Sequence, residues 1–202
     1  MNMNRAFLGK PAGNVTSQIA HFLTTVLLPL GDVVIDSHSG GRRMEFLPCV
    51  HMPRVSDLEQ RRKMLAAMLA WSTDFGFRYA GIAGSGLRNV LMRVCALRDQ
   101  AQTRQSLSKA PTILTHALNR EDYLLAPESG VFEVCLELGQ EVQKGYIVGH
   151  IHYPERPDRQ PETIVAQTSG DLLTMRASCL TQQGHCVAVI AQQVSLNQVL
   201  RQ

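Results

Sequence analysis

The sequence has little of what marks disulfide-stapled, thiolate-zinc or membrane-spanning proteins. Its cysteines are five in number, which is odd, and no two have C-x-x-C spacing, so neither a disulfide framework nor a thiolate zinc knuckle is predicted. We expect all of them to be buried, reduced thiols: Cys49, Cys95, Cys135, Cys179 and Cys186. No apolar run approaches the roughly 20 residues that cross a bilayer, and residues 26–30 are interrupted by Pro29. A cytoplasmic protein with no membrane partner is therefore the default expectation.

Charge of one sign is not concentrated either. The 20 basic and 17 acidic residues give a net charge of +3 and are spread along the chain. The basic runs, residues 42–43 and 61–63, are expected to be solvated surface. No nucleic-acid partner is expected, since such proteins carry a concentrated basic face. With 45% apolar residues in 202, the chain is long enough for one large domain or two small ones.

One short apolar run ends in a histidine and paired glycines. Residues 32–36 hold three consecutive β-branched residues between turn formers, which predicts a buried strand of a parallel sheet. His38 follows that strand, where ligands collect in open α/β sheets, and Gly40 and Gly41 allow the backbone to approach a ligand closely. A lone histidine in this place is more often a hydrogen-bonded structural residue, so the pattern alone leaves both roles open.

The other segments of residues 1–110 predict an α/β unit. Apolar residues at helical spacing predict a helix over residues 15–27, capped by Asn14 or Thr16, with one face in the core. Its end is expected at Pro29. The next apolar segment, residues 44–50, predicts one strand at a sheet edge or bulge, because a proline lies within it.

A second helix and a domain boundary are predicted further along. A capping box at residues 56–59 opens a helix that runs through Trp71 with an apolar stripe including Leu58. In the glycine-punctuated segment that follows, residues 81–86 match neither standard phosphate-loop pattern, and no apolar strand directly precedes them. A further amphipathic helix is expected over residues 87–97. The polar residues after it, up to 110, predict the domain boundary.

Residues 111–202 contain an internal repeat, over residues 126–151 and 166–191. Each copy opens with a similar pentapeptide, A-P-E-S-G or A-Q-T-S-G, and continues as strand, glycine turn and strand. Neither copy could bury its apolar face alone, so the repeat predicts a small quasi-symmetric all-β barrel. The pattern resembles the barrel-sandwich shape of biotinyl and lipoyl carrier domains. The connection between the copies lacks the lysine that would carry the cofactor.

Several stretches together resemble the succinylglutamate desuccinylase and aspartoacylase family, and most closely its N-acetyl-diaminobutyrate deacetylase branch. Residues 4–9 match the end of an Asp-x-Asn-Arg-x-Phe-Pro-Gly motif, with Leu8 in place of the proline. Residues 36–41 match Asp-x-His-Ser-Gly-Gly, and residues 86–89 match a Gly-x-Arg-Asn signature. The resemblance implies a carboxypeptidase-like α/β domain followed by a small all-β barrel-sandwich domain.

The resemblance also implies roles for individual residues. Arg5, helped by Asn4, would hold the carboxylate of the substrate, a task that suits a planar guanidinium. His38 would be the third zinc ligand. The implied activity is zinc-dependent hydrolysis of the amide bond of a small N-acylated amino acid.

Parts of the family site have no counterpart. The first two zinc ligands lie in a His-Gly-x-Glu motif upstream of Asn-Arg, where this sequence begins. The general base is the Glu of a Thr-Glu-Leu-Gly-Gly segment, and residues 75–86 contain no acidic residue. Look-alikes at residues 137–139 and 152–155 lie in the repeat and its connection, and we do not assign them those roles. His150 and His152 are expected to share one strand face as a solvent-facing pair.

Two hypotheses about function follow. The chain is either a deacylase whose missing groups come from elsewhere, such as a separately encoded fragment, or a truncated, inactive relative that serves as a binding module or persists as a remnant. A lone imidazole does not make a catalytic zinc site, and loss of a base lowers rates by about 10² to 10⁴, which favours the second. No residue is assigned as catalytic. A sheet lacking its first strands would expose an apolar edge, which predicts a homo-oligomer or a complementing fragment.

Overall fold

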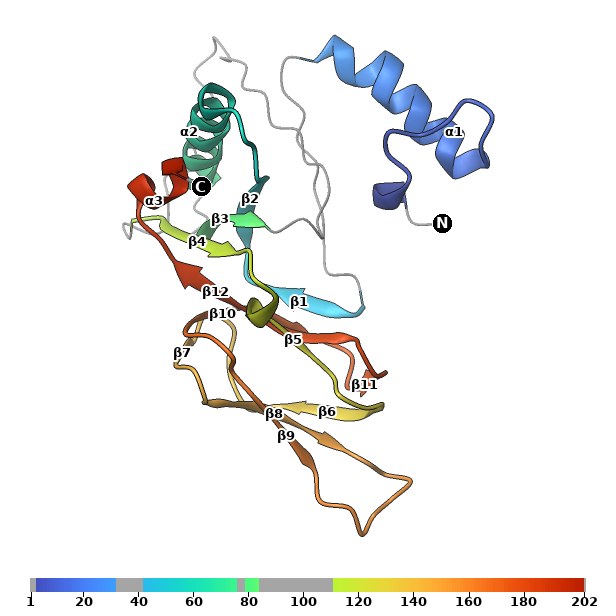
Figure 1. Ribbon diagram of the computed structural model, residues 1–202, viewed down its shortest axis with the longest axis vertical. Helices are drawn as coiled ribbons and strands as arrows, with labels where there is room; N and C mark the ends of the chain where they lie inside the picture. The colour runs from blue at the N-terminus through green and yellow to red at the C-terminus, as the bar shows by residue number, and fades with distance from the viewer. Residues whose placement is uncertain (1–2, 32–41, 76–78, 84–110, 202) are drawn as a thin grey trace.

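The computed structural model describes residues 3–31, 42–75, 79–83 and 111–201, and these form a mixed fold of helices and two sheets (Figure 1). The helical elements are η1 (Met3–Arg5), α1 (Val15–Phe22), η2 (Leu23–Leu27), η3 (Leu28–Leu30), α2 (Leu58–Phe75), η4 (Arg120–Asp122) and α3 (Leu196–Arg201). The strands are β1 (Met44–Phe46), β2 (Cys49–Pro53), β3 (Tyr79–Ala83), β4 (Ile113–Ala117), β5 (Tyr123–Leu125), β6 (Gly130–Val134), β7 (Glu141–Val142), β8 (Ile147–His152), β9 (Glu162–Val165), β10 (Gly170–Arg176), β11 (Leu180–Thr181) and β12 (Cys186–Gln193).

The first sheet joins a parallel part to an antiparallel part. Strands β2, β3 and β4 are parallel neighbours, and α2 and α3 pack over them (Figure 1). Met52 of β2 and Met64 and Met68 of α2 meet in this core, each at most 2% exposed. β12 pairs with β10 and β5 and, at its far end, with β4, so one strand carries the sheet from the repeat to the parallel part.

The prediction for residues 44–50 was wrong in one respect, because the segment forms two strands. β1 pairs antiparallel with β10, whereas β2 pairs in parallel with β3 and ends the described sheet. The break falls at Leu47 and Pro48. Since proline has no N–H to donate to a ladder, it separates the two pairings.

Strand β3 was not predicted, because it lies in the glycine-rich segment. Gly81 sits in the middle of this strand, beside Thr115 of β4. A Cβ at Gly81 would lie 2.8 Å from Thr115 Oγ1 and 2.9 Å from Thr115 O. Glycine therefore allows the two strands to pack closely here, whereas in a sequence a glycine usually indicates the interruption of a strand.

Helix α1 begins as predicted, but its apolar face is not core. Asn14 Oδ1 accepts a hydrogen bond from the Ser17 N–H at 3.0 Å, which confirms the cap. The helical path continues through η2 and η3, and Pro29 lies in the first turn of η3, where a missing N–H is tolerated. Only Ala20 is buried on α1, while Phe22 is 52% exposed. The apolar spacing identified the helix correctly, but no described element covers its apolar face (Figure 1).

Helix α2 also begins near the predicted place. Its cap is Asp57, whose Oδ1 accepts from the Gln60 N–H at 2.7 Å, one residue later than the predicted capping box. Leu65 and Met68 of the predicted stripe are buried, whereas Leu58 is 44% exposed because it lies in the first turn.

Reciprocal hydrogen bonds join the two copies of the predicted repeat. The Gly145 N–H donates to Ala166 O, and the Gly184 N–H donates to Ala126 O, both at 2.8 Å. The turn of each copy is thus bound to the opening residues of the other copy. The short strands are exchanged in the same way. β7 of the first copy pairs with β10 of the second, and β11 of the second copy pairs with β6 of the first.

The two copies fill one core from equivalent positions. The buried pairs are Phe132 and Leu172, Val148 and Val187, and Ile151 and Ile190, none more than 4% exposed. Both copies also carry a register shift at the start of their last strand, in β8 and in β12. The two halves therefore share their packing as well as their sequence pattern.

The prediction that all cysteines are buried was wrong. Cys135 and Cys179 are exposed, and Cys49 and Cys186 are half-buried. All four are free thiols, and the fifth, Cys95, lies outside the described residues. Burial raises the pKa of the Cys49 and Cys186 thiols, which keeps them protonated. None of the helices within the described ranges is long and apolar enough to cross a membrane.

Candidate functional site

The loop that carries Arg5 is folded back onto α1. Arg5 ends the single turn η1, with Asn4 in the same turn, and its side chain is exposed. The Lys10 N–H donates to Ser17 Oγ at 2.9 Å and to Ser17 O at 3.2 Å. Ala6, the next residue of the loop, is buried at 8% exposure. The turn that presents Arg5 is thereby held on a helix.

The backbone at Gly9 shows why the Asn-Arg motif has a glycine at this position. Its φ is +76°, a backbone region that side chains disfavour. A Cβ there would lie 2.1 Å from His21 N and 2.5 Å from Ser17 O. Only glycine lets the loop lie this close to α1.

The predicted metal ligand cannot be placed beside Arg5. His38 and its neighbours at 32–41 lie outside the described residues, as do the predicted helix at 87–97, the Gly-x-Arg-Asn signature and the predicted boundary at 99–110. Within the described part of the chain, no three His, Cys, Asp or Glu side chains gather as a metal site. The described residues by themselves do not fit a zinc ion.

His150 and His152 lie on one face of β8, as predicted, with ring centroids 6.4 Å apart. His152 Nε2 lies 2.7 Å from Glu133 Oε2, and His150 Nδ1 lies 3.3 Å from Thr163 Oγ1. Each ring is therefore bound to a neighbouring strand. His152 pairs with Glu133 across the sheet, which is a structural use of this histidine.

The connection between the repeats carries an ion-pair cluster that was not predicted from the sequence. Glu128 accepts from Arg159 through both carboxylate oxygens and from Arg156, all at 2.8 Å. These bonds, with the Arg159 bonds strongest, lower the pKa of Glu128 to about 2. The Arg159 guanidinium also lies 3.8 Å from the centroid of the Tyr153 ring. No local pattern signals this cluster, because Glu128 lies at the start of the first copy.

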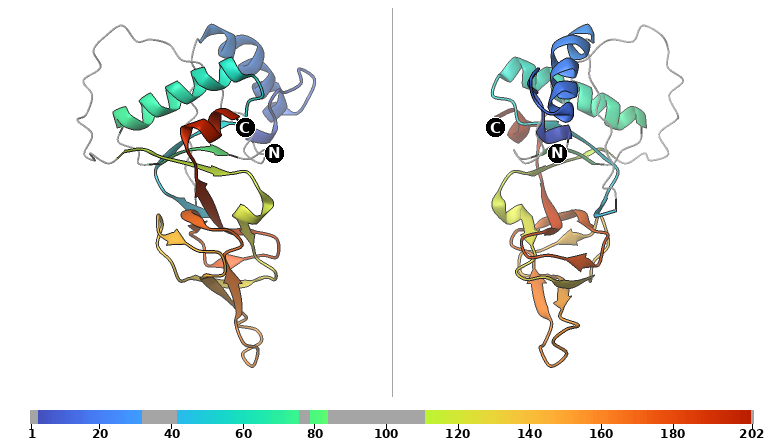
Figure 2. Two further views of the ribbon diagram at one scale, coloured as in Figure 1. Left: turned by 60° about the vertical axis from the view of Figure 1, so that its left-hand side comes forward. Right: turned by 90° about the vertical axis from the view of Figure 1, so that its right-hand side faces the viewer.

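The cluster holds the hairpin that projects from the end of the molecule (Figure 2). Tyr153 is 5% exposed, and its hydroxyl donates to Glu162 Oε2 at 2.8 Å. The segment with the spacing of a zinc-ligand pair, residues 152–155, is thus the base of this hairpin. Its contacts support a structural role rather than a metal role.

Comparison with known proteins relates most of the chain to one family. The family described as succinylglutamate desuccinylase/aspartoacylase catalytic domain matches residues 1–143. N-alpha-acetyl-L-2,4-diaminobutyric acid deacetylase of Halomonas elongata is 26% identical over 228 aligned residues. The alignment covers 96% of this chain and 66% of that protein, so the chain spans just under two thirds of its relative's length.

Solved structures show the same fold. The succinylglutamate desuccinylase/aspartoacylase of Rhodobacter sphaeroides superposes with a TM-score of 0.82 at 24% identity, over 96% of this chain and 68% of that one. The product-bound ectoine utilization protein EutE (DoeB) of Ruegeria pomeroyi gives a TM-score of 0.77 at 22% identity, over 95% and 68%. At these identities the likeness establishes the fold.

Proposed function

The chain belongs to the succinylglutamate desuccinylase/aspartoacylase family, deacylases that act on N-acyl amino acids, and from this membership we propose that it binds a small N-acylated amino acid. Arg5 is the proposed contact for the substrate's carboxylate, with Asn4 beside it. The exposed position of Arg5 on a turn held against α1 supports this role, because a fixed guanidinium fork suits a carboxylate.

We further propose that this chain by itself does not hydrolyse the amide bond of such a substrate. The observation that carries this part is internal to the sequence: no Asp or Glu occurs between Asp74 and Asp99, where the family places its general base. Without a carboxylate to take the proton from water, the rate should fall by about 10² to 10⁴. His38 is the proposed zinc ligand, because it stands at the histidine position of the family's Asp-x-His-Ser-Gly-Gly motif.

A second candidate function is hydrolysis within a complex in which another chain supplies the missing groups. The exposed apolar side chains of α1 and the turns after it favour this candidate. They are Val15, Ile19, Phe22, Val26, Leu27 and Leu30, all at least 43% exposed. Either a second copy of this chain or a complementing fragment would cover them. Light scattering on the purified chain distinguishes these two, because only a second copy would raise the mass measured for the chain by itself.

We also propose that residues 111–202 form a barrel-sandwich domain without a carrier lysine, in a cytoplasmic protein. The reciprocal hydrogen bonds between the repeats support the domain shape. The four described cysteines, all free thiols, support the compartment, since disulfides are rare in the cytosol.

The test uses the purified full chain, with and without added zinc, and N-acetyl-L-2,4-diaminobutyrate. Calorimetry should detect binding, and an assay for released amine should detect no turnover. Arg5→Ala should weaken binding by about tenfold or more, and Arg5→Lys by less, since lysine keeps the charge but not the fork. Arg62→Ala, an exposed arginine on α2, is the matched control.

Two results would contradict the proposal. Zinc-dependent turnover by the purified chain would show that a base is present after all. Binding that is absent, or unchanged in Arg5→Ala, would remove Arg5 from the site.

A further inference from the structure

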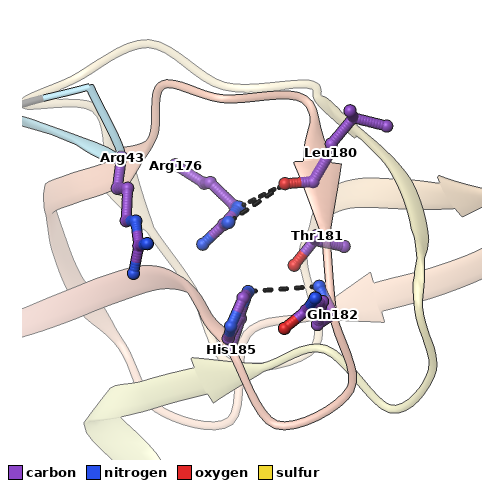
Figure 3. Close-up of a pocket in the computed structure, with 6 residues that line it drawn as sticks. All are labelled: Arg43, Arg176, Leu180, Thr181, Gln182 and His185. Atoms are coloured by element: carbon purple, nitrogen blue, oxygen red, sulfur yellow. Dashed lines mark hydrogen bonds between the residues drawn. The ribbon is translucent and has the colours of Figure 1, made fainter.

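A pocket of about 240 Å³ lies where β1, the end of β10 and the second repeat's turn meet (Figure 3). Its lining residues are Arg43, Arg176, Leu180, Thr181, Gln182 and His185. The pairing of β1 with β10 builds it, since Met44 lies opposite Arg176 and the Ala177 N–H donates to Arg43 O at 3.0 Å. The Arg43, Arg176, Thr181 and His185 side chains are arranged around one space (Figure 3).

The arginine, threonine and histidine side chains that face this space can all donate hydrogen bonds. Arg176 uses Nε and Nη2 to bind Leu180 O, at 3.1 Å and 3.0 Å, which fixes its guanidinium and leaves Nη1 available. His185 Nδ1 accepts from the Gln182 N–H at 3.1 Å, so the neutral ring carries its proton on Nε2. No carboxylate lines the pocket, and in the described residues neither Arg43 nor Arg176 is in an ion pair.

Thr181 gives an independent sign of a ligand site. It is 5% exposed, and its Oγ1 has no hydrogen-bond partner among the described residues. A buried hydroxyl without a partner is unfavourable, and native structures hold few of them. The hydroxyl points toward the space between the Arg176 and His185 side chains (Figure 3).

The first repeat serves as an internal control. Counting from Gly130 and Gly170, Leu136 takes the place of Arg176. Counting from the turn glycines Gly145 and Gly184, Val142 takes the place of Thr181. By the same count Tyr146 takes the place of His185. The shared backbone therefore requires none of the three polar residues, which occur together in the second copy alone.

We propose that this pocket is a binding site for a small oxyanion, either phosphate or the carboxylate of a small acid. The guanidinium groups of Arg43 and Arg176 would neutralise it, and Thr181 Oγ1 and His185 Nε2 would each donate a hydrogen bond. An occupied site would tie β1 to the β10–β12 hairpin and so stabilise the folded chain. The site does not depend on the proposed function, because Arg5 does not line it.

The experiment titrates the full chain with sodium phosphate and, in a separate arm, with sodium succinate, at constant ionic strength made up with chloride. Calorimetry should show saturable binding of at least one anion, and the tighter anion identifies the source. The melting temperature should rise with that anion. Arg43→Gln should weaken binding by about tenfold or more, and Thr181→Val by a smaller factor.

Arg62→Gln, a change at an exposed arginine of α2, is the control and should leave this binding unchanged. Long-range ¹⁵N–¹H NMR should show the Nε2–H form of the His185 ring and a shift of its signals on titration. The site is overturned if neither anion binds saturably, if chloride gives the same effect, or if Arg43→Gln and Thr181→Val bind as the unchanged chain does.

Discussion

The two copies of the repeat share a backbone plan but differ in the polar groups that they carry. In the first copy Glu128 gathers Arg156 and Arg159, whereas its counterpart in the second copy, Thr168, accepts a hydrogen bond from Gln192. The second copy instead has the donor-lined pocket. The backbone is maintained by exchanged hydrogen bonds and by glycines, so polar side chains around it can differ without loss of the fold.

The largest loss of stability is expected from substitutions at the two glycines that open the strands of each copy, where the copies are most alike. A Cβ at Gly130 would lie 2.5 Å from His152 O, and one at Gly170 would lie 2.3 Å from Ala191 O. Because both clashes are with backbone, Gly130→Ala and Gly170→Ala should each lower the free energy of unfolding by about 3 kcal/mol. Urea denaturation measures this.

The turn glycines give the matched control for that comparison. Gly145 and Gly184 have φ of +91° and +78°, with open space where a Cβ would lie. Changing either to alanine should lower the free energy of unfolding by only about 1 kcal/mol, from backbone strain. Unequal losses in the two copies, at either pair, would show that the equivalence is one of sequence only.

An intermediate effect is expected from exchanging the residues that make the copies differ. Without a bound anion, Thr181→Val should raise the free energy of unfolding by about 1 kcal/mol, because it removes a buried hydroxyl that lacks a partner among the described residues. Val142→Thr should lower it by about 1 to 3 kcal/mol, because it buries a hydroxyl at a position that is fully buried. Thermal denaturation of both variants checks the opposite signs, and equal signs would refute the comparison.

The smallest effect on stability is expected from the acid titration of the half-exposed Glu128 cluster. The pKa of Glu128 is lowered from 4.5 to about 2 by its bonds to Arg159 and Arg156. Its contribution to stability is therefore full above pH 4.5 and is lost as the pH falls toward 2. Glu128→Gln should flatten the fall of the melting temperature between these pH values. An unchanged slope would mean that solvent screens the cluster completely.

Much of the fold was predictable where neighbouring residues decide it. The cap at Asn14 and, to within one residue, the start of α2 follow from short patterns, and the structure confirms them. The two-copy repeat also follows from a short pattern, and reciprocal hydrogen bonds join its copies. β3 was missed because the packing of Gly81 against Thr115 depends on a strand more than 30 residues away in sequence, which only the folded sheet brings close. The exposure of α1 was missed for a related reason: spacing shows that a face is apolar but not whether anything covers it.

The candidate site divides in the same way. The sequence by itself determined the family motifs around Arg5 and His38 and the absence of an acidic residue between Asp74 and Asp99, since these are properties of the order of residues. Only the tertiary structure decided that Arg43 and Arg176 line one pocket, that Thr181 has no partner among the described residues, and that Glu128 reaches Arg159. These contacts join residues far apart in the chain, and their energies depend on burial and distance, which no local pattern contains.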